Sequence, residues 1–466
     1  MTLLAVRTLV RLLNTIEPTQ DLKDATGVAY DSRSVRRGDI FFALPGASGH
    51  GMVYADAALE RGAAFIVSDR PHRQGLLVDD ARAALLALGR AARDRLGVPV
   101  VAVTGSVGKT STKAMLAAAM RARSTAGNLN THYAIAQTLI DAAMADTSAP
   151  DGATALVIEL GIDRIGEMAE LLELTRPDHA LLTTISPSHL SALGDLAGVA
   201  REKTLLLDRT NGVTVASAQA AAYLNPETLA RTVVVAVGDG VTPEPYPGAL
   251  GSVRGAAAAH GTATRLTWRS DDDGGTVDLP WPGSGMAQNA LSALTLATLT
   301  GTPVQEAAAG LVSAQLEPGR LAFSDLPGIT LLDDSYNSNP TSLREAIAVL
   351  RASPPPHVAF LGDMRELGAL ERDAHLQAGE LTTQLDLTVA VGPASAALLE
   401  TNPQAVHEPD ARAALRHLGA VPVGATVLVK GSRSMGMELL ATELKRLAAL
   451  GAWQPDDDAP KEGAAC

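Results

Sequence analysis

The stretch Val98–Thr112 reads VPVVAVTGSVGKTST and decides the fold of this chain. Its apolar, valine-rich beginning predicts a strand buried on both faces. A glycine-bearing loop follows, and Ser111–Ala122 is predicted to form a helix. Glycines let backbone N–H groups approach phosphate oxygens, and a helix N-terminus favours negative charge. The sequence therefore predicts a nucleotide phosphate site made by Thr104, Gly105, Ser106, Val107, Gly108, Lys109 and Thr110.

The last two residues of this loop carry specific chemistry. Lys109 supplies a full positive charge, and the Thr110 hydroxyl is of the kind that reaches Mg²⁺. The general motif G-x-x-x-x-G-K-[ST] would place glycine at position 103, where this chain has Val103, but the shorter pattern T-G-S-x-G-K-T is complete. The flanking strand and helix disfavour the alternative, a chance Gly-Lys-Thr turn.

Length and composition limit the possible classes of protein. A chain of 466 residues is too long for a single core, so two to four domains are expected. The net charge of −13 disfavours a general nucleic-acid binder or a protein held on anionic lipid. The only cysteine, Cys466, fits a reducing compartment, and no apolar run reaches the ~18 residues of a spanning helix. Arg7 and Arg11 predict an amphipathic first helix instead of a signal peptide. We therefore expect a cytoplasmic protein without membrane insertion or a nucleic-acid partner.

The order of predicted elements indicates an α/β protein of three domains. We expect a small N-terminal α/β domain in residues 1–97 and a central parallel-sheet domain with the phosphate loop in residues 98–318. Residues 319–450 are predicted to form a Rossmann-like domain of four strand–loop–helix units, and residues 451–466 a disordered tail. The C-terminal segment lacks G-x-G-x-x-G, so a dinucleotide site is not indicated.

Polar side chains stand at the ends of two predicted strands of the central domain. Glu159 ends the apolar run Thr154–Leu160, which makes it a candidate Mg²⁺ ligand, since ligands bind beyond the carboxyl ends of parallel strands. The alternative is a surface glutamate that caps the next helix. His189 follows strand His179–Ile185, and structural and functional roles stay equally open for it. Lys203 lies in a charged helical triplet, which is typical of a solvated surface residue.

Other polar segments are less specific. Gly127–Thr131 is rich in Asn and predicts a turn, and residues 262–279 predict a β-hairpin at the edge of the domain. Asn289 is predicted to cap a helix over Ala290–Thr300. The polar loop that begins at Asp31 is equally compatible with a nucleotide-sugar site and with a plain turn.

Several of these strings together resemble the Mur ligase family, over nearly the whole chain to about Leu447. The loop Thr104–Thr110 is similar to the family's short phosphate loop, and Glu159, His189 and Lys203 follow in the family's order. Asp31-Ser32-Arg33 resembles the family's UDP-binding segment. The strings at Asp333–Pro340 and Leu428–Met435 resemble most closely the branch that adds D-Ala-D-Ala.

The resemblance implies an ATP-dependent amide-bond ligase of peptidoglycan precursor synthesis. It implies UDP-N-acetylmuramoyl-tripeptide and D-Ala-D-Ala as substrates, ATP and Mg²⁺ as cofactors, and an acyl-phosphate intermediate. We expect a monomer whose domains close around the nucleotide, because residues of two domains must meet there.

The resemblance also implies roles for individual residues. The expected catalytic residues are Lys109, His189 and Lys203, and the expected metal ligands are Thr110, Glu159, His189 and Lys203. Lys203 can bind a cation only after carbamoylation, which the lysine of this family undergoes. Beyond the phosphate loop, the expected ATP-binding residues are Asn289, Arg320 and Asp334. The expected substrate-binding residues are Asp31, Ser32, Arg33, Asn128, Asn130, Thr131, Tyr336, Asn337, Lys430, Ser432 and Arg433.

The chain departs from the family pattern at two places, and other functions compete. Ala134 and Ala136 stand where the family usually has Gly and Pro, and Gly285 and Met286 stand where it usually has a His-Asn pair. The nearest alternative is another Mur-type or a folylpolyglutamate-type ligase. A non-catalytic nucleotide-binding protein would not need Glu159, His189 and Lys203 together, and a P-loop GTPase would carry Asn-Lys-x-Asp, which is missing here.

Overall fold

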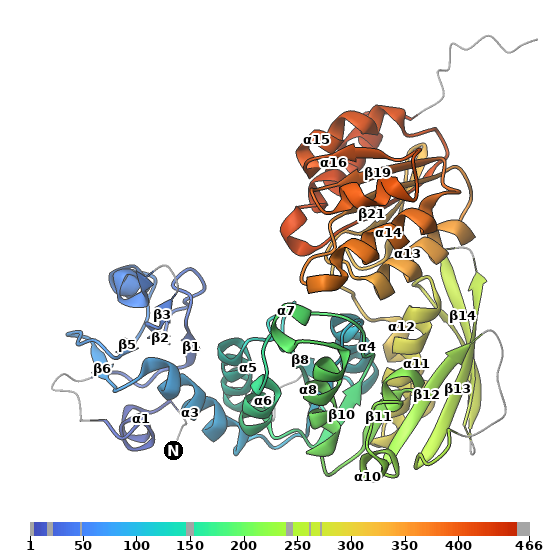
Figure 1. Ribbon diagram of the computed structural model, residues 1–466. Helices are drawn as coiled ribbons and strands as arrows, with labels where there is room; N and C mark the ends of the chain where they lie inside the picture. Colours follow the sequence, from blue (N-terminus) through green and yellow to red (C-terminus); the bar gives the residue numbers. More distant parts are fainter. Residues whose placement is uncertain are drawn as a thin grey trace, which may run out of the picture.

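A computed structural model describes residues 4–15, 22–46, 49–145, 153–238, 246–260, 262–270 and 273–453. The chain folds into an N-terminal unit at one side, a central unit, and a C-terminal unit stacked on the central one (Figure 1). Each of the three large sheets lies within one of the predicted segments 1–97, 98–318 and 319–450. The predicted α/β class with three domains is confirmed.

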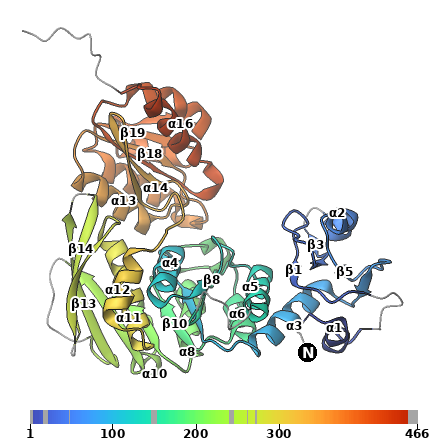
Figure 2. The same ribbon diagram turned by 180° about the vertical axis from the view of Figure 1, so that it is seen from behind.

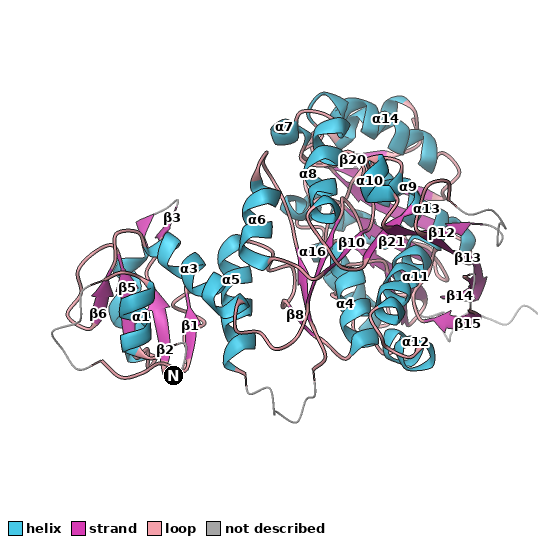
Figure 3. Ribbon diagram, turned by 90° about the horizontal axis from the view of Figure 1, so that it is seen from below, coloured by secondary structure: helices cyan, strands magenta, loops and turns pink. Residues whose placement is uncertain are grey.

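The N-terminal unit is a small parallel sheet with helices around it. Its strands pair in the order β1-β2-β5-β6, all parallel. Their bounds are β1 Gly27–Ala29, β2 Asp39–Phe42, β5 Phe65–Ser68 and β6 Gly75–Leu77, with the short pair β3 Pro45–Gly46 and β4 Gly49–His50. The helices are α1 Val6–Leu12, α2 Ala55–Glu60 and α3 Ala81–Arg93. Viewed from below, this unit joins the rest of the molecule through α3 (Figure 3).

The central unit is a mostly parallel sheet of nine strands among the described residues. The order is β15-β14-β13-β12-β11-β10-β7-β9-β8, with only β14 and β15 antiparallel to their neighbours. The strands are β7 Val100–Thr104, β8 Arg123–Ser124, β9 Leu156–Glu159, β10 His179–Leu182, β11 Thr214–Ser217, β12 Thr232–Gly238, β13 Gly251–His260, β14 Ala263–Arg269 and β15 Gly274–Leu279. The predicted edge hairpin is confirmed as β14 and β15.

Helices cover both faces of the central sheet (Figures 1 and 2). The helices α4 Lys109–Met120, α11 Ser284–Leu299 and α12 Val304–Val312 share one buried cluster with alternate residues of β7. The helices α5 His132–Met144, α6 Glu167–Thr175 and α8 Leu196–Asp208 contribute to the other cluster, which continues into the N-terminal unit through α3. Three one-turn helices complete the unit: α7 Leu190–Leu193, α9 Ala218–Ala221 and α10 Pro226–Leu229.

The C-terminal unit is a six-stranded sheet in the part of the chain that the structure describes. The order is β16-β17-β21-β18-β19-β20, and β16 alone runs antiparallel. The strands are β16 Ala322–Leu326, β17 Ile329–Asp334, β18 His357–Gly362, β19 Leu387–Val391, β20 Val406–Glu408 and β21 Thr426–Lys430. The helices are α13 Pro340–Ala352, α14 Glu371–Thr382, α15 Ala411–Ala414 and α16 Glu438–Ala449.

Several local predictions need correction. Helix α4 begins at Lys109 and not at Ser111, so the lysine of the phosphate loop already belongs to the first helical turn. Helix α11 begins at Ser284, which places Asn289 inside the helix and excludes the predicted cap. Gly283 adopts φ +89° just before this helix starts.

Several strands, β13 and β16 among them, and the end of the C-terminal unit were not predicted. Strand β13 is rich in Gly and Ala and lacks the alternation of polar and apolar residues that predicts a strand. Its pairing with β12 and β14, and not the preference of its own residues, makes it a strand. The edge strand β16 was also missed. The unit extends to Trp453, whose Nε1 donates a 2.9 Å hydrogen bond to Val421 O. The rest of the predicted disordered tail, 454–466, lies outside the described residues.

No helix in the described ranges is both long and apolar enough to cross a bilayer.

Candidate active site

A cleft opens where the carboxyl ends of the central strands face the C-terminal unit. Its cavity volume is about 370 Å³. Sixteen of the predicted site residues line it: Ser106, Val107, Gly108, Lys109, Thr110, Asn128, Asn130, Thr131, Glu159, His189, Asn289, Arg320, Asp334, Tyr336, Asn337 and Lys430. The structure therefore brings together residues that are up to about 320 positions apart in the sequence.

The phosphate loop turns tightly between β7 and α4. Gly108 adopts φ +84° just before the helix, and a Cβ there would lie 2.6 Å from Asn289 Oδ1. Glycine is therefore required at this position, both for its backbone conformation and for the close approach of α11. The first N–H groups of α4 have no partner inside the helix and lie at the cleft, where an anion can use them.

The loop after β10 holds the phosphate loop in place. Ser106 N donates to Thr184 O at 2.8 Å, and Val107 N donates to Thr184 Oγ1 at 3.0 Å. Thr183 Oγ1 donates to Val107 O at 2.6 Å, and Ser106 Oγ donates to Ser186 O at 2.8 Å. These bonds fix the turn before any ligand binds, which is the preorganisation that anion binding needs.

Lys109 is half-buried at the end of the loop, where α4 begins. Its Nζ donates a 2.9 Å hydrogen bond to Gly105 O. Burial lowers the pKa of Lys109, and the nearby carboxylate of Glu159 opposes this effect. A triphosphate would supply the negative charge that this ammonium group lacks.

Thr110 and Glu159 form a buried oxygen pair beside Lys109. The Thr110 hydroxyl donates to Glu159 Oε2 at 2.8 Å, and Asn130 Nδ2 donates to Glu159 Oε1 at 3.1 Å. Lys113 Nζ lies 3.8 Å from Glu159 Oε2 and donates to Thr125 O at 2.8 Å. Glu159 thus lies inside the fold and does not cap a surface helix.

These two oxygens suit a Mg²⁺ ion that is bound together with substrate phosphates. They do not form a metal site made by protein side chains alone. Among the described residues, no group of three or more His, Cys, Asp or Glu side chains lies close enough together to hold a metal ion. Mg²⁺ usually keeps several water ligands and binds through one or two carboxylates together with substrate phosphates. One carboxylate and one hydroxyl next to a phosphate loop meet that need.

Lys203 lies on α8 and His189 just before α7, and of the two only His189 lines the cleft. Lys203 is only 1% exposed, so the interpretation as a solvated surface residue is wrong. Burial lowers the pKa of Lys203 well below its usual value, and the charge of Lys109 adds to the effect. Burial also lowers the pKa of His189, while the carboxylate of Glu366 opposes that shift. Lys203 lies close enough to Lys109, Asp163 and Glu159 to sense their charges.

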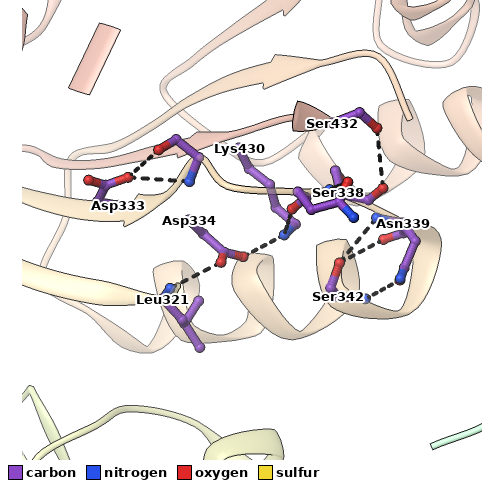
Figure 4. A network of polar contacts seen from close by, with 10 residues as sticks. Leu321, Asp333, Asp334, Ser338, Asn339, Ser342, Lys430 and Ser432 are labelled. Atoms are coloured by element: carbon purple, nitrogen blue, oxygen red, sulfur yellow. Dashed lines mark hydrogen bonds and ion pairs between the residues drawn. The ribbon is translucent and has the colours of Figure 1, made fainter. Parts of the chain in front are cut away.

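The C-terminal unit contributes a buried ion pair (Figure 4). Lys430 Nζ at the end of β21 donates to Asp334 Oδ2 at the end of β17, and to Asn337 O at 2.9 Å. Asp334 Oδ1 accepts a 3.0 Å hydrogen bond from Leu321 N. Burial raises the pKa of Asp334 although Lys430 opposes the shift.

A cation–π stack covers the same wall of the cleft. The guanidinium carbon of Arg320 lies 4.0 Å from the centre of the Tyr336 ring, and that of Arg433 lies 5.4 Å from it. Arg320 and Tyr336 line the cleft, whereas Arg433 and Ser432 do not. Ser432 Oγ instead accepts from Arg365 N at 2.9 Å, which ties two loops of the C-terminal unit together.

Other predicted site residues lie away from the cleft. The Thr104 hydroxyl donates to Leu160 O at 2.8 Å inside the sheet, and Gly105 packs against Thr183. Asp31, Ser32 and Arg33 lie in the N-terminal unit, where Arg33 Nε donates to Asp31 Oδ1 at 3.0 Å. Tyr30, next to Asp31, contacts the central unit, since its ring centre lies 6.2 Å from that of Tyr133 on α5.

Among the residues that reasoning from the sequence missed at the site are four charged ones. Lys113, one helical turn after Lys109, supports the Asn-rich segment through Thr125 O and Gly127 O. Asp163 and Glu167 line the cleft after β9, and Glu345 reaches the N-terminus of α11, where Gly285 N donates to its Oε2 at 3.1 Å. The charged residues that follow the strand end at Glu159 were a usable signal for Asp163 and Glu167. Lys113 and Glu345 had no such signal, because they act through residues distant in the sequence.

Comparisons with known proteins identify the family. The profile of the Mur ligase middle domain matches residues 103–297, that of the Mur ligase glutamate ligase domain matches 319–433, and that of the Mur ligase family catalytic domain matches 24–124. An Escherichia coli K12 UDP-N-acetylmuramoyl-tripeptide–D-alanyl-D-alanine ligase is 34% identical over 435 residues, which cover 90% of this chain and 93% of that protein. The chain belongs to the Mur ligase family.

Solved structures agree with this membership. A crystal structure of MurF from Acinetobacter baumannii matches this Mur ligase with a TM-score of 0.82 and 27% identity, covering 95% of this chain and 98% of that one. A MurF ligase from Thermotoga maritima in complex with ADP matches with a TM-score of 0.77 and 24% identity, covering 93% and 100%. The likeness to the Thermotoga maritima structure shows a shared fold alone.

Proposed function

We propose that this Mur ligase joins D-Ala-D-Ala to UDP-N-acetylmuramoyl-tripeptide at the expense of ATP, in the synthesis of peptidoglycan precursors. The observation that carries the proposal is the shared cleft, in which Lys109 and Thr110 of the central unit face Asp334, Tyr336 and Lys430 of the C-terminal unit. The full-length similarity to a ligase named for this reaction supports the choice of substrates.

The first step is phosphoryl transfer between two anions. The terminal carboxylate of the tripeptide attacks the γ-phosphorus of ATP, and the bond to the β-phosphate oxygen breaks, which gives an acyl phosphate and ADP. Such a reaction needs alignment and charge neutralisation more than covalent help. Lys109 and the free N–H groups at the start of α4 are placed to hold the β- and γ-phosphates.

Bound Mg²⁺ would supply further positive charge to the phosphates. Thr110 and Glu159 would hold one ion, and His189 with a carbamoylated Lys203 would hold a second. The buried, weakly basic amine of Lys203 suits carbamoylation, because only a neutral amine adds to CO₂. Glu159 would also keep Lys113 and Asn130 in position around the site.

The second step forms the amide bond. The amine of D-Ala-D-Ala attacks the acyl carbon, and the tetrahedral intermediate expels inorganic phosphate while the nitrogen loses a proton. Tyr336, Asn337 and Lys430 line the cleft from the C-terminal side and would hold either the dipeptide or the nucleotide. Asn289 would contact the adenine, and Asp31, Ser32 and Arg33 would hold the UDP group in the N-terminal unit.

Phosphate release tests this function directly. The protein is given ATP, Mg²⁺ and UDP-N-acetylmuramoyl-tripeptide, with D-Ala-D-Ala or with single amino acids as acceptors. With the tripeptide donor, we expect phosphate release only when D-Ala-D-Ala is the acceptor. With UDP-N-acetylmuramoyl-dipeptide as the donor, we expect much less phosphate release. Release driven by an amino acid added to the dipeptide donor would favour the tripeptide-forming sister enzyme, and release with a folate donor would favour a folylpolyglutamate synthase.

Domain closure and quaternary state need separate measurements. Small-angle scattering should show compaction with nucleotide and both substrates, because the cleft lies between two units. The monomeric state and the cytoplasmic location expected from the sequence stay predictions.

A further inference from the structure

One residue of the C-terminal unit contacts two consecutive residues of the central unit. Glu366 Oε2 lies 2.6 Å from His189 Nδ1, and Glu366 O accepts a 3.0 Å hydrogen bond from Leu190 N. The side chain and the main chain of Glu366 therefore both cross the boundary between the two units. The contact lies at the rim of the cleft, since His189 lines it.

Both partners adopt a backbone conformation that is rare for residues with a side chain. His189 has φ +51° and Glu366 has φ +66°. Each such conformation costs on the order of 1 kcal/mol or more and persists only where the surroundings determine it. Two of them meeting at one contact indicate that the geometry is held by both units and is not a chance approach.

The loop that carries Glu366 is fixed within the C-terminal unit. Arg365 N donates to Ser432 Oγ at 2.9 Å, and Met364 N donates to His375 Nε2 at 3.0 Å. Met364 and Leu367 are both 1% exposed and anchor the loop on either side of Glu366. Ser432 follows Lys430 by two residues, so the loop is connected to the wall of the cleft.

The contact also decides which nitrogen of His189 is available. A carboxylate accepts hydrogen bonds, so the 2.6 Å contact favours a proton on Nδ1, and in the neutral ring Nε2 then keeps the lone pair. Histidines that bind metal ions usually have their other ring nitrogen held by a carboxylate or carbonyl in this way. Asp163 Oδ1 lies 3.3 Å from the same Nδ1, but it belongs to the central unit and its side chain is 82% exposed.

We propose that Glu366 is a positioning residue that orients the His189 ring and couples this orientation to docking of the C-terminal unit on the central unit. When the C-terminal unit moves away, His189 loses its shorter contact and keeps only the 3.3 Å contact with the exposed Asp163. The cleft is then ready for catalysis only when the residues of the C-terminal unit that line it are in place. The proposal rests on the proposed function for its role in turnover, but the docking contact itself does not.

Hydrogen exchange of the ligand-free protein tests the docking contact. We expect the Leu190 amide to be protected, and Glu366→Ala to speed exchange in a peptide covering residues 190–194 by about fivefold or more. The matched control is Glu380→Ala, an exposed glutamate on α14 of the same unit, which should leave this peptide unchanged. An unprotected wild-type amide, or equal exchange in Glu366→Ala and wild type, would overturn the proposal.

Turnover of two variants tests the positioning role. Glu366→Gln keeps an oxygen that accepts from Nδ1–H, so its kcat should stay within about threefold of wild type. Glu366→Ala removes the acceptor, and its kcat should fall about tenfold or more, with KM for ATP changing less and the melting temperature unchanged. Equal loss in Gln and Ala variants, a loss that follows a lower melting temperature, or a kcat within twofold for Glu366→Ala would each contradict the proposal.

The two measurements separate this proposal from the proposed function. Exchange is measured without substrates, so its result stands whichever donor and acceptor the enzyme uses. Failure of every acceptor to support phosphate release would remove the proposed function and leave the docking result unaffected.

Discussion

The Thr110 hydroxyl donates a 2.8 Å hydrogen bond to Glu159 Oε2 in the interior of the central unit. Thr110 lies on the first turn of α4, and Glu159 ends β9, the strand that pairs with β7. The parallel pairing of β7 with β9 therefore brings a hydroxyl and a carboxylate together beside the phosphate loop. These two oxygens are the first candidates for a cation that accompanies ATP.

Replacing Glu159 by Gln should weaken the use of Mg²⁺. The substitution keeps the size of the side chain and an acceptor for Thr110, but it removes the charge that attracts the cation. We expect the Mg²⁺ concentration for half-maximal phosphate release to rise about tenfold or more. Glu173→Gln, on an exposed position of α6, is the control and should not change it. An unchanged Mg²⁺ dependence in Glu159→Gln would remove Glu159 from the metal site.

Replacing Lys203 should lower the activity without lowering the thermal stability. The side chain is 1% exposed, and a buried amine costs free energy that an apolar side chain of similar size avoids. Lys203→Met should therefore unfold at the same temperature as wild type or higher, while phosphate release falls at least about a hundredfold. Thermal unfolding in CO₂-free buffer and the phosphate assay measure the two effects.

The carbamoylation proposal for Lys203 has its own test. Lys203→Ala leaves room for a small anion, so acetate or formate should restore part of the lost activity. The same salts should not help Lys109→Ala, because a carboxylate cannot replace an ammonium group that binds phosphate. Full activity of Lys203→Ala without added carboxylate would exclude this role.

The Tyr336 ring should matter more than its hydroxyl. Arg320 stacks on the ring at 4.0 Å, and such contacts are worth about 0.5–2 kcal/mol. Tyr336→Ala should raise KM for ATP or for D-Ala-D-Ala by roughly 3- to 30-fold, whereas Tyr336→Phe should stay within about threefold of wild type. Steady-state kinetics with each substrate varied in turn will show which ligand this wall holds. Equal effects of Phe and Ala would assign the role to the hydroxyl instead.

The sequence predicted the elements that carry a strong local pattern. Strand β7, the phosphate loop and α4 follow from the valine run, the glycines and Lys109, and most strands of the C-terminal unit follow from short apolar runs. Glu159, Asp334 and Lys430 could be placed at one edge of their sheets, because each stands at the carboxyl end of a parallel strand. The family resemblance supplied the roles, which residue types alone left open for His189 and Lys203.

Features that depend on tertiary contact could not be predicted in this way. Strand β13 consists largely of Gly and Ala and is defined by its neighbours on both sides. The start of α11 was obscured by two glycines, although Glu345 of the other unit accepts from Gly285 N at that end. Glu366 lies in a loop that was noted only as polar, and its meaning comes from a contact about 180 residues away.

The last prediction concerns the buried pair of Lys430 and Asp334. Removing one partner of a buried ion pair leaves the other charge without compensation, which typically costs about 3–5 kcal/mol. Lys430→Met and Asp334→Asn should therefore each lower the stability of the C-terminal unit, and the double variant should be less destabilised than the sum, with a coupling of about 1–3 kcal/mol.

A local reporter makes this coupling measurable in the intact three-unit chain. Trp453 is buried in the C-terminal unit, and the other two tryptophans, Trp268 and Trp281, belong to the central unit. In a background where both of these are replaced by Phe, urea unfolding followed by Trp453 fluorescence reports the C-terminal unit alone. Asp334 Oδ1 also accepts a hydrogen bond from Leu321 N, and an asparagine at this position keeps that oxygen. Asp334→Asn should therefore be less destabilising than Lys430→Met. Additive losses in the double variant would show that the two side chains contribute independently and that the pair does not hold this wall of the cleft.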